Sequence, residues 1–422
     1  MLSALVVTAC RPVPRTSGPL AHDAYVWQRE WNPHVTASVR SNAGVFGVLS
    51  VLVGEISWTA RAPKVVRVTP DATALQDLTN NPRLGIVLRV GTYPGPFEAD
   101  DSTARMLRRT ARECVDATRQ AGIAVAELQV DFDCAERHLG GYRIWVQALR
   151  REVAPIPVVI TALLSWLNHR SFRDLVAASD GFILQVHSLA RPRHLHEPAS
   201  LCDPEAARRA VERAARVTGG VPFRVALPTY GYLLAFGTNG AYLGASAEGP
   251  PPARPPGTQL RELTADPTTL AQLVTDWTGD RPASMKGLIW YRLPVKGDQF
   301  NWRWRTLESV MAGRSPSARL QATTVSPSPE LTEIILENIG SADRTGPVAI
   351  RLRWSGAQRL GADGIRGFEA LFTGPHDVLF TNAICRLPAG ERSRIGWVRL
   401  DAPAPITLEA VVPSDPQPSG TR

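Results

Sequence analysis

The chain has 422 residues, 44% of them hydrophobic and 20% charged, which excludes a disordered polyelectrolyte and a polytopic membrane protein. Its formal net charge of +8 would suit an anionic partner, but a nucleic-acid footprint needs basic residues clustered on one face. Apart from Lys64, Lys286 and Lys296, the basic residues are arginines scattered through the sequence. We therefore expect a globular protein without a nucleic-acid partner.

The N-terminal residues form a short apolar run that ends in Val7-Thr8-Ala9-Cys10. This ending resembles the bacterial lipobox, whose cysteine becomes the lipidated first residue of the mature protein. Arg11 stands where an aspartate would mark inner-membrane retention, and residues 11–18 have the composition of a tether. We expect a signal remnant and tether over residues 1–21, a membrane anchor at Cys10, and an outer-membrane lipoprotein that is periplasmic or at the cell surface. An accidental match is the alternative.

From residue 22 to residue 314, short runs typical of strands alternate with helix-length amphipathic stretches. The predicted strands are Ala24–Gln28, Val45–Ile56, Leu84–Val90, Glu127–Phe132, Pro157–Leu163, Gly181–Val186, Pro222–Leu227 and Lys286–Tyr291. The predicted helices are Asp101–Ala121, Gly141–Glu152, Ser171–Ala178, Asp203–Thr218 and Pro267–Thr278. Eight strands alternating with helices predict an α/β fold, a (β/α)8 barrel of the TIM type. A Gly- and Pro-rich stretch, residues 237–264, predicts a long loop before the last strand.

After Ser315 the pattern changes to alternating runs with turn signals between them, such as Leu331–Glu337, Val348–Trp354 and Ile395–Leu400. This change predicts a small antiparallel β-sandwich over residues 315–412. Residues 413–422 are polar and rich in Pro and Ser, which predicts a disordered tail.

Besides Cys10, the chain has Cys114, Cys134, Cys202 and Cys385, with no spacing typical of a zinc site. A disulfide between Cys134 and Cys202 is the pairing to test first, and unpaired buried thiols are the alternative. The histidines of His194-Leu195-His196 lack a carboxylate at a metal-binding spacing. We expect neither a metal nor another cofactor.

Two acids follow one another on the fourth predicted strand. Because strand residues alternate between two faces, Gln129, Asp131 and Asp133 share a face, and functional groups of such barrels lie at the carboxyl ends of the strands. Neighbouring carboxylates push their pKa values apart, as general acid catalysis requires. We expect Asp133, nearer the strand end, to be the general acid and Asp131 to stay charged. The structural alternative is that Asp131 pairs with an interior arginine, Arg89 or Arg292.

A second catalytic acid should stand across the cleft from the first. Glu55, near the end of the second predicted strand, is the main candidate, and Asp180 and Glu197 are loop alternatives. Aromatic and polar residues at the other strand ends are candidates for substrate binding, because aromatic faces stack on sugars. These are Trp27, Trp31, Gln129, Trp166, Gln185, His187, Tyr230, Trp290, Tyr291 and Arg292.

Five segments, residues 25–31, 128–134, 160–167, 184–187 and 226–231, resemble a family of uncharacterised, often lipoprotein-like bacterial proteins with a domain of unknown function. The resemblance implies a glycoside-hydrolase-like barrel without an established substrate. The fourth strand is also similar to the Asp-x-Asp-x-Glu strand of chitinase-type glycosidases, whose Glu is the acid. Here Ala135 takes that position and Glu136 is out of phase, so that mechanism does not transfer.

Two-glutamate retaining enzymes end their seventh strand with a nucleophile, which Leu227-Pro228-Thr229-Tyr230 lacks. The expected function is that of a glycoside-hydrolase-like protein acting on a cell-envelope or extracellular polysaccharide. The alternatives are a carbohydrate-binding lipoprotein without catalysis and a structural envelope protein.

Overall fold

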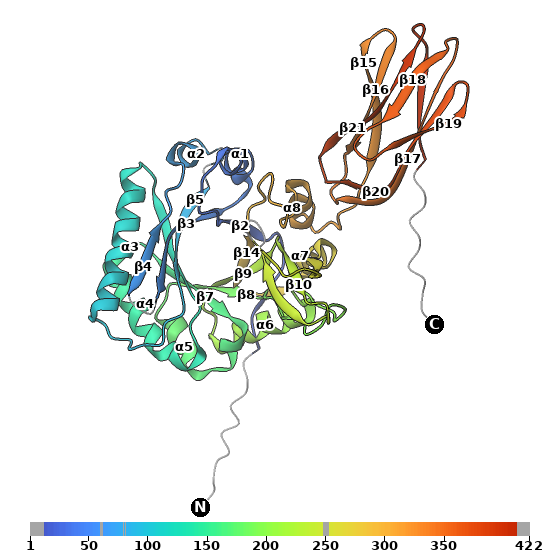
Figure 1. The fold of residues 1–422 in the computed structure, drawn as a ribbon. Coiled ribbons are helices and arrows are strands. Elements are labelled where there is room, and N and C mark those ends of the chain that lie inside the picture. The colour runs from blue at the N-terminus through green and yellow to red at the C-terminus, as the bar shows by residue number, and fades with distance from the viewer. Residues whose placement is uncertain (1–11, 60–61, 79, 81, 248–252, 412–422) are drawn as a thin grey trace, which may run out of the picture. The chain divides into compact units, whose positions relative to one another are not determined.

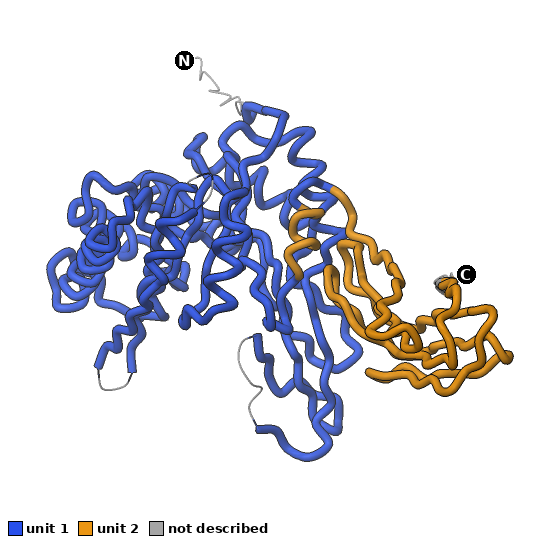
Figure 2. The backbone as a smooth tube through the Cα atoms, turned by 90° about the horizontal axis from the view of Figure 1, so that it is seen from above, with its two compact units in different colours: residues 1–302, 311–313 blue, residues 303–310, 314–422 orange. Residues whose placement is uncertain are grey.

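The computed structural model describes residues 12–59, 62–78, 80, 82–247 and 253–411. The chain divides into two compact units (Figure 2), the first comprising residues 1–302 and 311–313 and the second residues 303–310 and 314–422. The proposed lipidation site Cys10 and the predicted tail from residue 413 lie outside the described residues.

A ring of parallel strands forms the centre of the first unit (Figure 1). Each strand pairs in parallel with its neighbours, and β2 pairs with β3 to close the ring. In the described residues the ring consists of β2 (Ala21–Val26), β3 (Val48–Trp58), β5 (Arg83–Val90), β6 (Val125–Phe132), β7 (Val158–Leu163), β8 (Phe182–Gln185), β9 (Phe223–Pro228) and β14 (Met285–Tyr291). The predicted barrel is confirmed, and each of the predicted strands overlaps one of these.

Helices surround the ring (Figure 1). They are α1 (Pro33–Asn42), α2 (Ala72–Gln76), α3 (Ser102–Gln120), α4 (Leu139–Val153), α5 (Arg170–Ala177), α6 (Pro204–Val217) and α7 (Pro267–Gly279). The capping residues explain where several begin: Asp101 accepts a hydrogen bond from the Ala104 N–H at 2.7 Å, and Asp203 from the Ala206 N–H at 2.8 Å. α1 and α2 carry too weak a periodic signal to be predicted.

Additional strands flank the ring. β1 (Arg15–Thr16) pairs with β13 (Arg281–Pro282), and β4 (Pro63–Arg67) forms a hairpin with β3. β10 (Gly231–Phe236), β11 (Tyr242–Ser246) and β12 (Gln259–Thr264) form an antiparallel sheet in the order β11-β10-β12. The prediction of a structureless loop over residues 237–264 is therefore wrong in part. Gly and Pro dominate the composition there and mask two short strands whose pairing with β10 is not visible in the sequence.

The second unit begins with α8 (Trp304–Met311) and continues as two antiparallel sheets. Over the described residues the sheets are β15 (Leu320–Ser328), β16 (Leu331–Asn338), β21 (Arg392–Leu400) and β18 (Arg359–Gly364), and β19 (Glu369–Gly374), β20 (Asp377–Leu387), β17 (Arg344–Trp354) and β22 (Ile406–Val411). Side chains of both sheets share one core, including Ile334, Ile350 and Phe380. A Cβ at Gly396 would lie 2.3 Å from the Phe380 ring, so only glycine lets the two sheets approach there. The expected β-sandwich is confirmed.

The amino end of the barrel interior is filled by a buried polar network. Arg224 donates to Asp23 at 2.7 Å and to Glu127 at 2.5 Å. Gln129 donates to both Glu127 and Ser50 at 2.6 Å. Above this network lies an apolar band that includes Leu52, Val87, Val159, Ile183 and Ile289. The interior is therefore closed at this end, and only the carboxyl end of the barrel is available for a ligand.

Replacement of Arg224 by Met should destabilise the first unit by about 3–5 kcal/mol, because Asp23 and Glu127 would remain buried without their counter-charge. Urea denaturation followed by tryptophan fluorescence measures this loss. The matched control is Arg105→Met, which removes an exposed arginine 3.9 Å from Asp100 and should change stability by no more than about 0.5 kcal/mol. Equal effects of the two substitutions would contradict the structural role of the network.

Candidate active site at the carboxyl end of the barrel

A cavity of about 530 Å³ opens at the carboxyl ends of the barrel strands. Its lining comprises Tyr25, Trp27, Arg89, Asp131, Asp133, Thr161, Gln185, His187, Ala226, Tyr230, Tyr232, Ala245, Ser246, Ala247, Tyr291 and Arg292. Eight of these side chains are site residues predicted from the sequence, brought together from β2, β6, β8, β9, β14 and the segments that follow them.

One wall of the cavity is aromatic, and Tyr291 of β14 is at its centre. The Tyr291 ring centroid is 5.0 Å from Trp27, 5.8 Å from Tyr25 and 5.4 Å from Tyr230. His187 stacks on Tyr291 at 5.8 Å with an interplanar angle of 28°. Strands β2, β14 and β9 are consecutive in the ring, so their ends give a continuous aromatic surface of the kind that stacks on sugar rings.

The other wall is polar and comes from β5, β6 and β7, which are also consecutive in the ring and lie opposite the aromatic strands. Asp131 accepts a hydrogen bond from the Thr161 hydroxyl at 2.7 Å. Arg89 lies beside Asp131 in the strand register and is 3.4 Å from Glu55. The positive charge of Arg89 acts on Asp131 and opposes the rise of its pKa, in keeping with the structural alternative of a pairing with an interior arginine.

Burial raises the pKa of Asp131, and the negative charge of Asp133 adds to this effect while the hydrogen bond from Thr161 opposes it. Asp133 is exposed at the mouth of the cavity. The raised pKa favours the protonated form of Asp131, the form that a general acid needs, whereas the sequence predicted that Asp133 would take this role.

The neutral groups beside this acid are buried. His187 is 5% exposed, and burial lowers its pKa to about 3. Its Nδ1 lies 3.4 Å from the Tyr230 hydroxyl. The Tyr25 hydroxyl is buried without a hydrogen-bond partner in the described structure, and burial together with the charge of Asp131 raises its pKa. The floor of the cavity thus presents uncharged groups that can form hydrogen bonds with a ligand.

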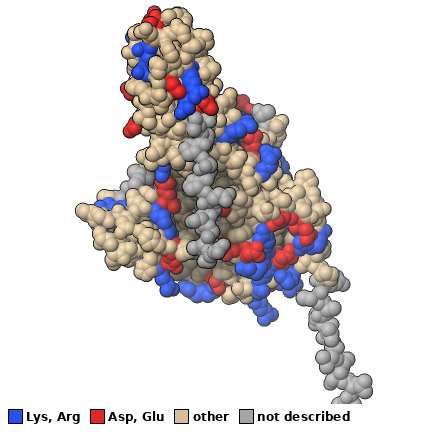
Figure 3. Space-filling view, turned by 90° about the vertical axis from the view of Figure 1, so that its right-hand side faces the viewer, with Lys and Arg blue, Asp and Glu red and all other residues tan. Residues whose placement is uncertain are grey.

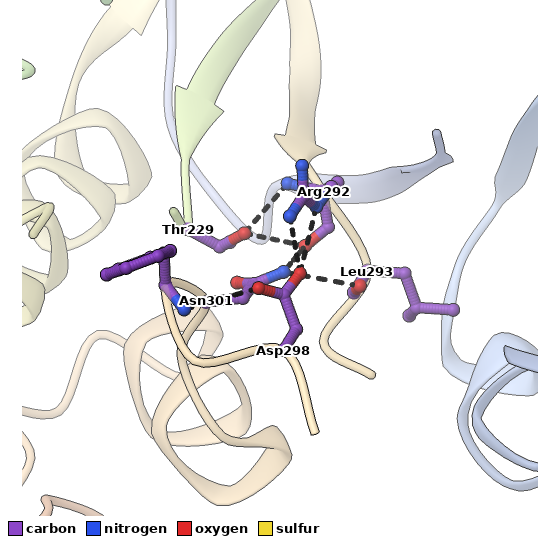
Figure 4. A network of polar contacts seen from close by, with 6 residues as sticks. Thr229, Arg292, Leu293, Asp298 and Asn301 are labelled. Atoms are coloured by element: carbon purple, nitrogen blue, oxygen red, sulfur yellow. Dashed lines mark hydrogen bonds and ion pairs between the residues drawn. The ribbon is translucent and has the colours of Figure 1, made fainter. Parts of the chain in front are cut away.

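Arg292 follows β14 and lines the cavity, and Figure 4 shows its polar contacts. Its side chain pairs with Asp298, and its backbone N–H donates to the Thr229 hydroxyl at 2.8 Å. The Thr229 hydroxyl donates in turn to the Arg292 carbonyl at 2.6 Å, and Asn301 donates to the same carbonyl at 3.2 Å. These contacts hold Arg292 in place and neutralise its charge, so we assign it a positioning role.

Three predicted binding residues are buried away from the cavity. Gln129 points inward but belongs to the polar network at the opposite end of the barrel. Trp166 is fully buried and donates to the Cys134 carbonyl at 3.1 Å. Trp290 is also fully buried and donates to His22 at 3.1 Å, because it faces outward from β14 whereas Tyr291 faces inward. The prediction that these residues bind substrate is wrong.

Trp31 is partly buried and packs against the interior cluster that contains Tyr25 and Trp27, outside the cavity lining. Its indole N–H has no hydrogen-bond partner among the described residues. Trp31 therefore supports the aromatic wall from behind.

None of the predicted second acids lines the cavity, although the charge of Glu55 acts on Asp131 and raises its pKa. Burial alone would raise the pKa of Glu55, but Arg29, at 2.6 Å, and Arg89 outweigh it and hold that pKa below its usual value. Asp180 pairs with Arg150 at 2.5 Å and precedes β8, at the amino end of the strands. Glu197 is exposed and accepts from the Arg193 N–H. Glu136 and Ala135 are exposed and outside the cavity lining.

Several lining residues were not predicted as site residues. Tyr25 and Thr161 occupy inward positions that alternation reveals, since Tyr25 precedes Trp27 by two residues and Thr161 lies beside Asp131. Ala245, Ser246 and Ala247 come from β11 and the residue after it. Small side chains on an unpredicted strand give no signal in the sequence.

The described cysteines Cys114, Cys134, Cys202 and Cys385 are buried free thiols, so the disulfide prediction for Cys134 and Cys202 is wrong. Within the described residues, no group of three or more His, Cys, Asp or Glu side chains is arranged to hold a metal ion. None of the helices described is both long and apolar enough to cross a bilayer. On the face drawn in Figure 3, basic side chains are interspersed with acidic ones.

Residues 93–296 match a family described as a domain of unknown function (DUF3142), and residues 321–401 match a second one (DUF8456). The resemblance to an uncharacterised domain-of-unknown-function family is confirmed. No curated protein gives a significant match.

Among solved structures, a chitinase from Chromobacterium violaceum ATCC 12472 is 17% identical, with a TM-score of 0.47 over 69% of this chain and 99% of that chain. The spore cortex-lytic enzyme SleL from Bacillus cereus is 13% identical, with a TM-score of 0.48 over 70% of this chain and 75% of that chain. The GH18 chitinase ChiB from Flavobacterium johnsoniae is 13% identical, with a TM-score of 0.45 over 70% of this chain and 94% of that chain. These likenesses concern the fold alone.

The buried imidazole of His187 should make stability depend on pH. A histidine in the unfolded chain has a pKa of about 6.5, whereas burial lowers the pKa of His187 to about 3. Between these values the unfolded state binds one more proton, so stability is full above about pH 6.5 and falls with acidification by roughly 1.4 kcal/mol per pH unit.

Urea denaturation between about pH 6.5 and 4.5 should therefore show a shallower pH slope for His187→Gln than for the wild type. His194→Gln, which changes an exposed histidine, is the control and should keep the wild-type slope. The same slope for His187→Gln and the wild type would show that His187 is accessible to protons in the folded state.

Proposed function

We propose that the cavity of the first unit binds a carbohydrate and that the protein hydrolyses a glycosidic bond with Asp131 as the proton donor. One observation carries this proposal: a carboxyl group whose pKa is raised by burial stands opposite a continuous aromatic wall. A carboxyl that keeps its proton to higher pH than an exposed one suits general acid catalysis of glycoside cleavage.

The arrangement suggests how a sugar would lie in the cavity. Its apolar face would stack on Tyr291 and Trp27, and its hydroxyls would reach Gln185 and the unpaired hydroxyl of Tyr25. The Asp131 proton would pass to the glycosidic oxygen as the bond breaks. Water would attack the anomeric carbon, and its proton would pass to a carboxylate.

Asp133 is the candidate for that carboxylate, because among the described lining residues the acids are Asp131 and Asp133. Both belong to one strand or its continuation, with Cα atoms about 6.5–7 Å apart by the strand rise. The scissile bond would therefore have to lie across the end of β6, so that the two carboxyls reach opposite sides of the anomeric carbon.

A second candidate function is carbohydrate binding without turnover. The observation that favours it is Ala135 at the position of the acid in chitinase-type strands, together with the absence of an acid from the aromatic wall formed by the described residues. In this case the same cavity would hold a glycan, and the raised pKa of Asp131 would serve hydrogen bonding alone.

Asp131→Asn should lower kcat on a cleaved glycan by about 10²–10⁴-fold, because the amide cannot donate the proton that leaves with the glycosidic oxygen, while glycan binding is largely kept. A panel of oligosaccharides tested for both turnover and binding provides the substrate. Asp180→Asn, at the opposite end of the barrel, is the matched control and should keep wild-type turnover.

Unchanged kcat in Asp131→Asn would remove Asp131 from catalysis. Binding of a glycan by the wild type with no turnover across the panel would establish the second candidate. A wild type that neither binds nor cleaves any member would contradict both.

We also propose that the protein is a lipid-anchored envelope protein, periplasmic or at the cell surface, which would place a cell-envelope or extracellular polysaccharide within reach. The Val7-Thr8-Ala9-Cys10 sequence supports this proposal. Cys10→Ser should move the protein from the detergent phase to the aqueous phase on detergent partitioning, because one acylated residue supplies the anchor. Cys202→Ser is the control. Detergent partitioning that Cys10→Ser leaves unchanged would refute the anchor.

A further inference from the structure

Thr161 of β7 and Asp131 of β6 are neighbours on adjacent strands of the ring. In the register of these strands Val130 lies beside Ile160, and Asp131 and Thr161 are the next residues along. Both side chains line the cavity of the candidate active site, and Thr161 is only 7% exposed. Since β7 is paired on both sides and Thr161 is β-branched, its side chain has little rotational freedom.

The Thr161 hydroxyl has one hydrogen to donate, and two acceptors lie near it. The Asp131 Oδ1 atom is 2.7 Å away and the Val130 carbonyl oxygen is 3.5 Å away. The Val130 carbonyl also accepts from the Tyr142 hydroxyl at 3.3 Å. A distance of 2.7 Å is ordinary for such a hydrogen bond, whereas 3.5 Å lies beyond the usual range. The Thr161 hydroxyl therefore donates to Asp131.

This hydrogen bond makes the two oxygens of the Asp131 carboxyl different. Oδ2 accepts no hydrogen bond from the described residues, and it is not among their buried unpaired atoms. Because Asp131 lines the cavity, Oδ2 is open to the cavity. A proton on Oδ1 would displace the Thr161 hydrogen and leave it only the 3.5 Å contact with Val130, whereas a proton on Oδ2 keeps the 2.7 Å bond.

Other titratable and charged groups act on Asp131 from the neighbouring elements. They are Asp133 just beyond β6, Arg89 of β5, Glu55 of β3, Tyr25 of β2 and Tyr142 of α4. None of them forms a hydrogen bond with the Asp131 carboxyl in the part of the chain that the structure describes. Thr161 contacts one oxygen of this carboxyl, and it is therefore the group that distinguishes Oδ1 from Oδ2.

We propose that Thr161 is a positioning residue: its hydroxyl holds Oδ1 of Asp131 and so places the acid proton on Oδ2, the oxygen open to the cavity. The catalytic consequence rests on the proposed function, in which Asp131 is the proton donor. The placement of the proton concerns the free protein and does not depend on glycan cleavage.

The placement is tested without a substrate by carbon-13 NMR of protein labelled at its aspartate carboxyls. The Asp131 signal is identified by its loss in Asp131→Asn. Thr161→Val should move the Asp131 titration to higher pH, because the ionised carboxyl loses a hydrogen bond that favours it. Thr161→Ser keeps the hydroxyl and should titrate like the wild type.

Thr218→Val is the matched control for this titration. Thr218 is a buried threonine outside the cavity lining, and its hydroxyl donates to the Ala214 carbonyl at 2.8 Å. The substitution removes one buried hydrogen bond, as Thr161→Val does, and should leave the Asp131 titration unchanged. Circular dichroism checks that both variants fold, and Thr161→Ala is the second variant if Thr161→Val does not.

The catalytic consequence is tested on a glycan that the wild type cleaves. Thr161→Val should lower kcat by about 10–100-fold and keep KM within about twofold, because a misplaced proton affects the transition state and not binding. The alkaline limb of the pH profile of kcat/KM should move to higher pH with the Asp131 titration. A merely destabilised variant would lose activity without this shift. Thr161→Ser should restore most of kcat.

A double substitution tests whether Thr161 acts through Asp131. Thr161→Val should lower kcat no further when Asp131→Asn is already present, because residues that act as one unit are not additive. A full additional loss in the double variant would show that Thr161 acts by another route and would overturn the proposal.

The NMR outcome separates this proposal from the proposed function. An Asp131 titration that is the same in the wild type and in folded Thr161→Val or Thr161→Ala would overturn the placement, whatever the activity. A shifted titration in a protein that cleaves no glycan would support the placement and contradict the proposed function alone. A shifted titration with unchanged kcat would refute the positioning role.

Discussion

Closure of the parallel ring is the constraint on which the rest of the first unit depends. Once β2 pairs with β3 and with β14, every strand must point alternate residues inward. At Gly287, where β14 meets β2, an added Cβ would lie 2.4 Å from the Ala21 carbonyl oxygen. The inward positions then form a polar network, an apolar band and a cavity in succession. A ligand site therefore exists at one end only.

The order of the strands in the ring divides this cavity into two walls. The aromatic side chains come from β2, β14 and β9, and the acid comes from β6 on the far side. Consecutive strands present adjacent side chains, so each wall is continuous even though its residues are far apart in the sequence. A flat ligand with an apolar face and polar edges would fit between such walls in few orientations. The arrangement supports the proposal of a sugar as the ligand over an elongated apolar molecule.

Alternation along the strands predicted the barrel and much of the site, and its failures have physical causes. Asp131 and Tyr291 were found because period-two alternation and position at a strand end agree. Trp166 and Trp290 were predicted to line the cavity because they lie near strand ends, but the direction of their side chains was not considered. Both side chains are buried in the packing outside the ring. The prediction of Glu55 as the second acid did not foresee its pairing with arginines, because these arginines come from elsewhere in the chain. The part of the cavity lining that comes from β11 could not be predicted, because its alanine and serine side chains give no signal in the sequence.

Desolvation distinguishes the surroundings of the two acids, which position along the strand does not reveal. In the deep part of the cavity, burial lowers the pKa of the His187 imidazole and raises the pKa of the Tyr25 hydroxyl and of the Asp131 carboxyl, so it favours the neutral form of each. Asp133, by contrast, is exposed at the mouth of the cavity. If the protein cleaves a glycoside as proposed, a leaving oxygen that gains negative charge in this cavity would be the acceptor of the Asp131 proton. The same burial that favours neutral groups at the floor also favours the protonated form of Asp131, which the proposed general acid would need.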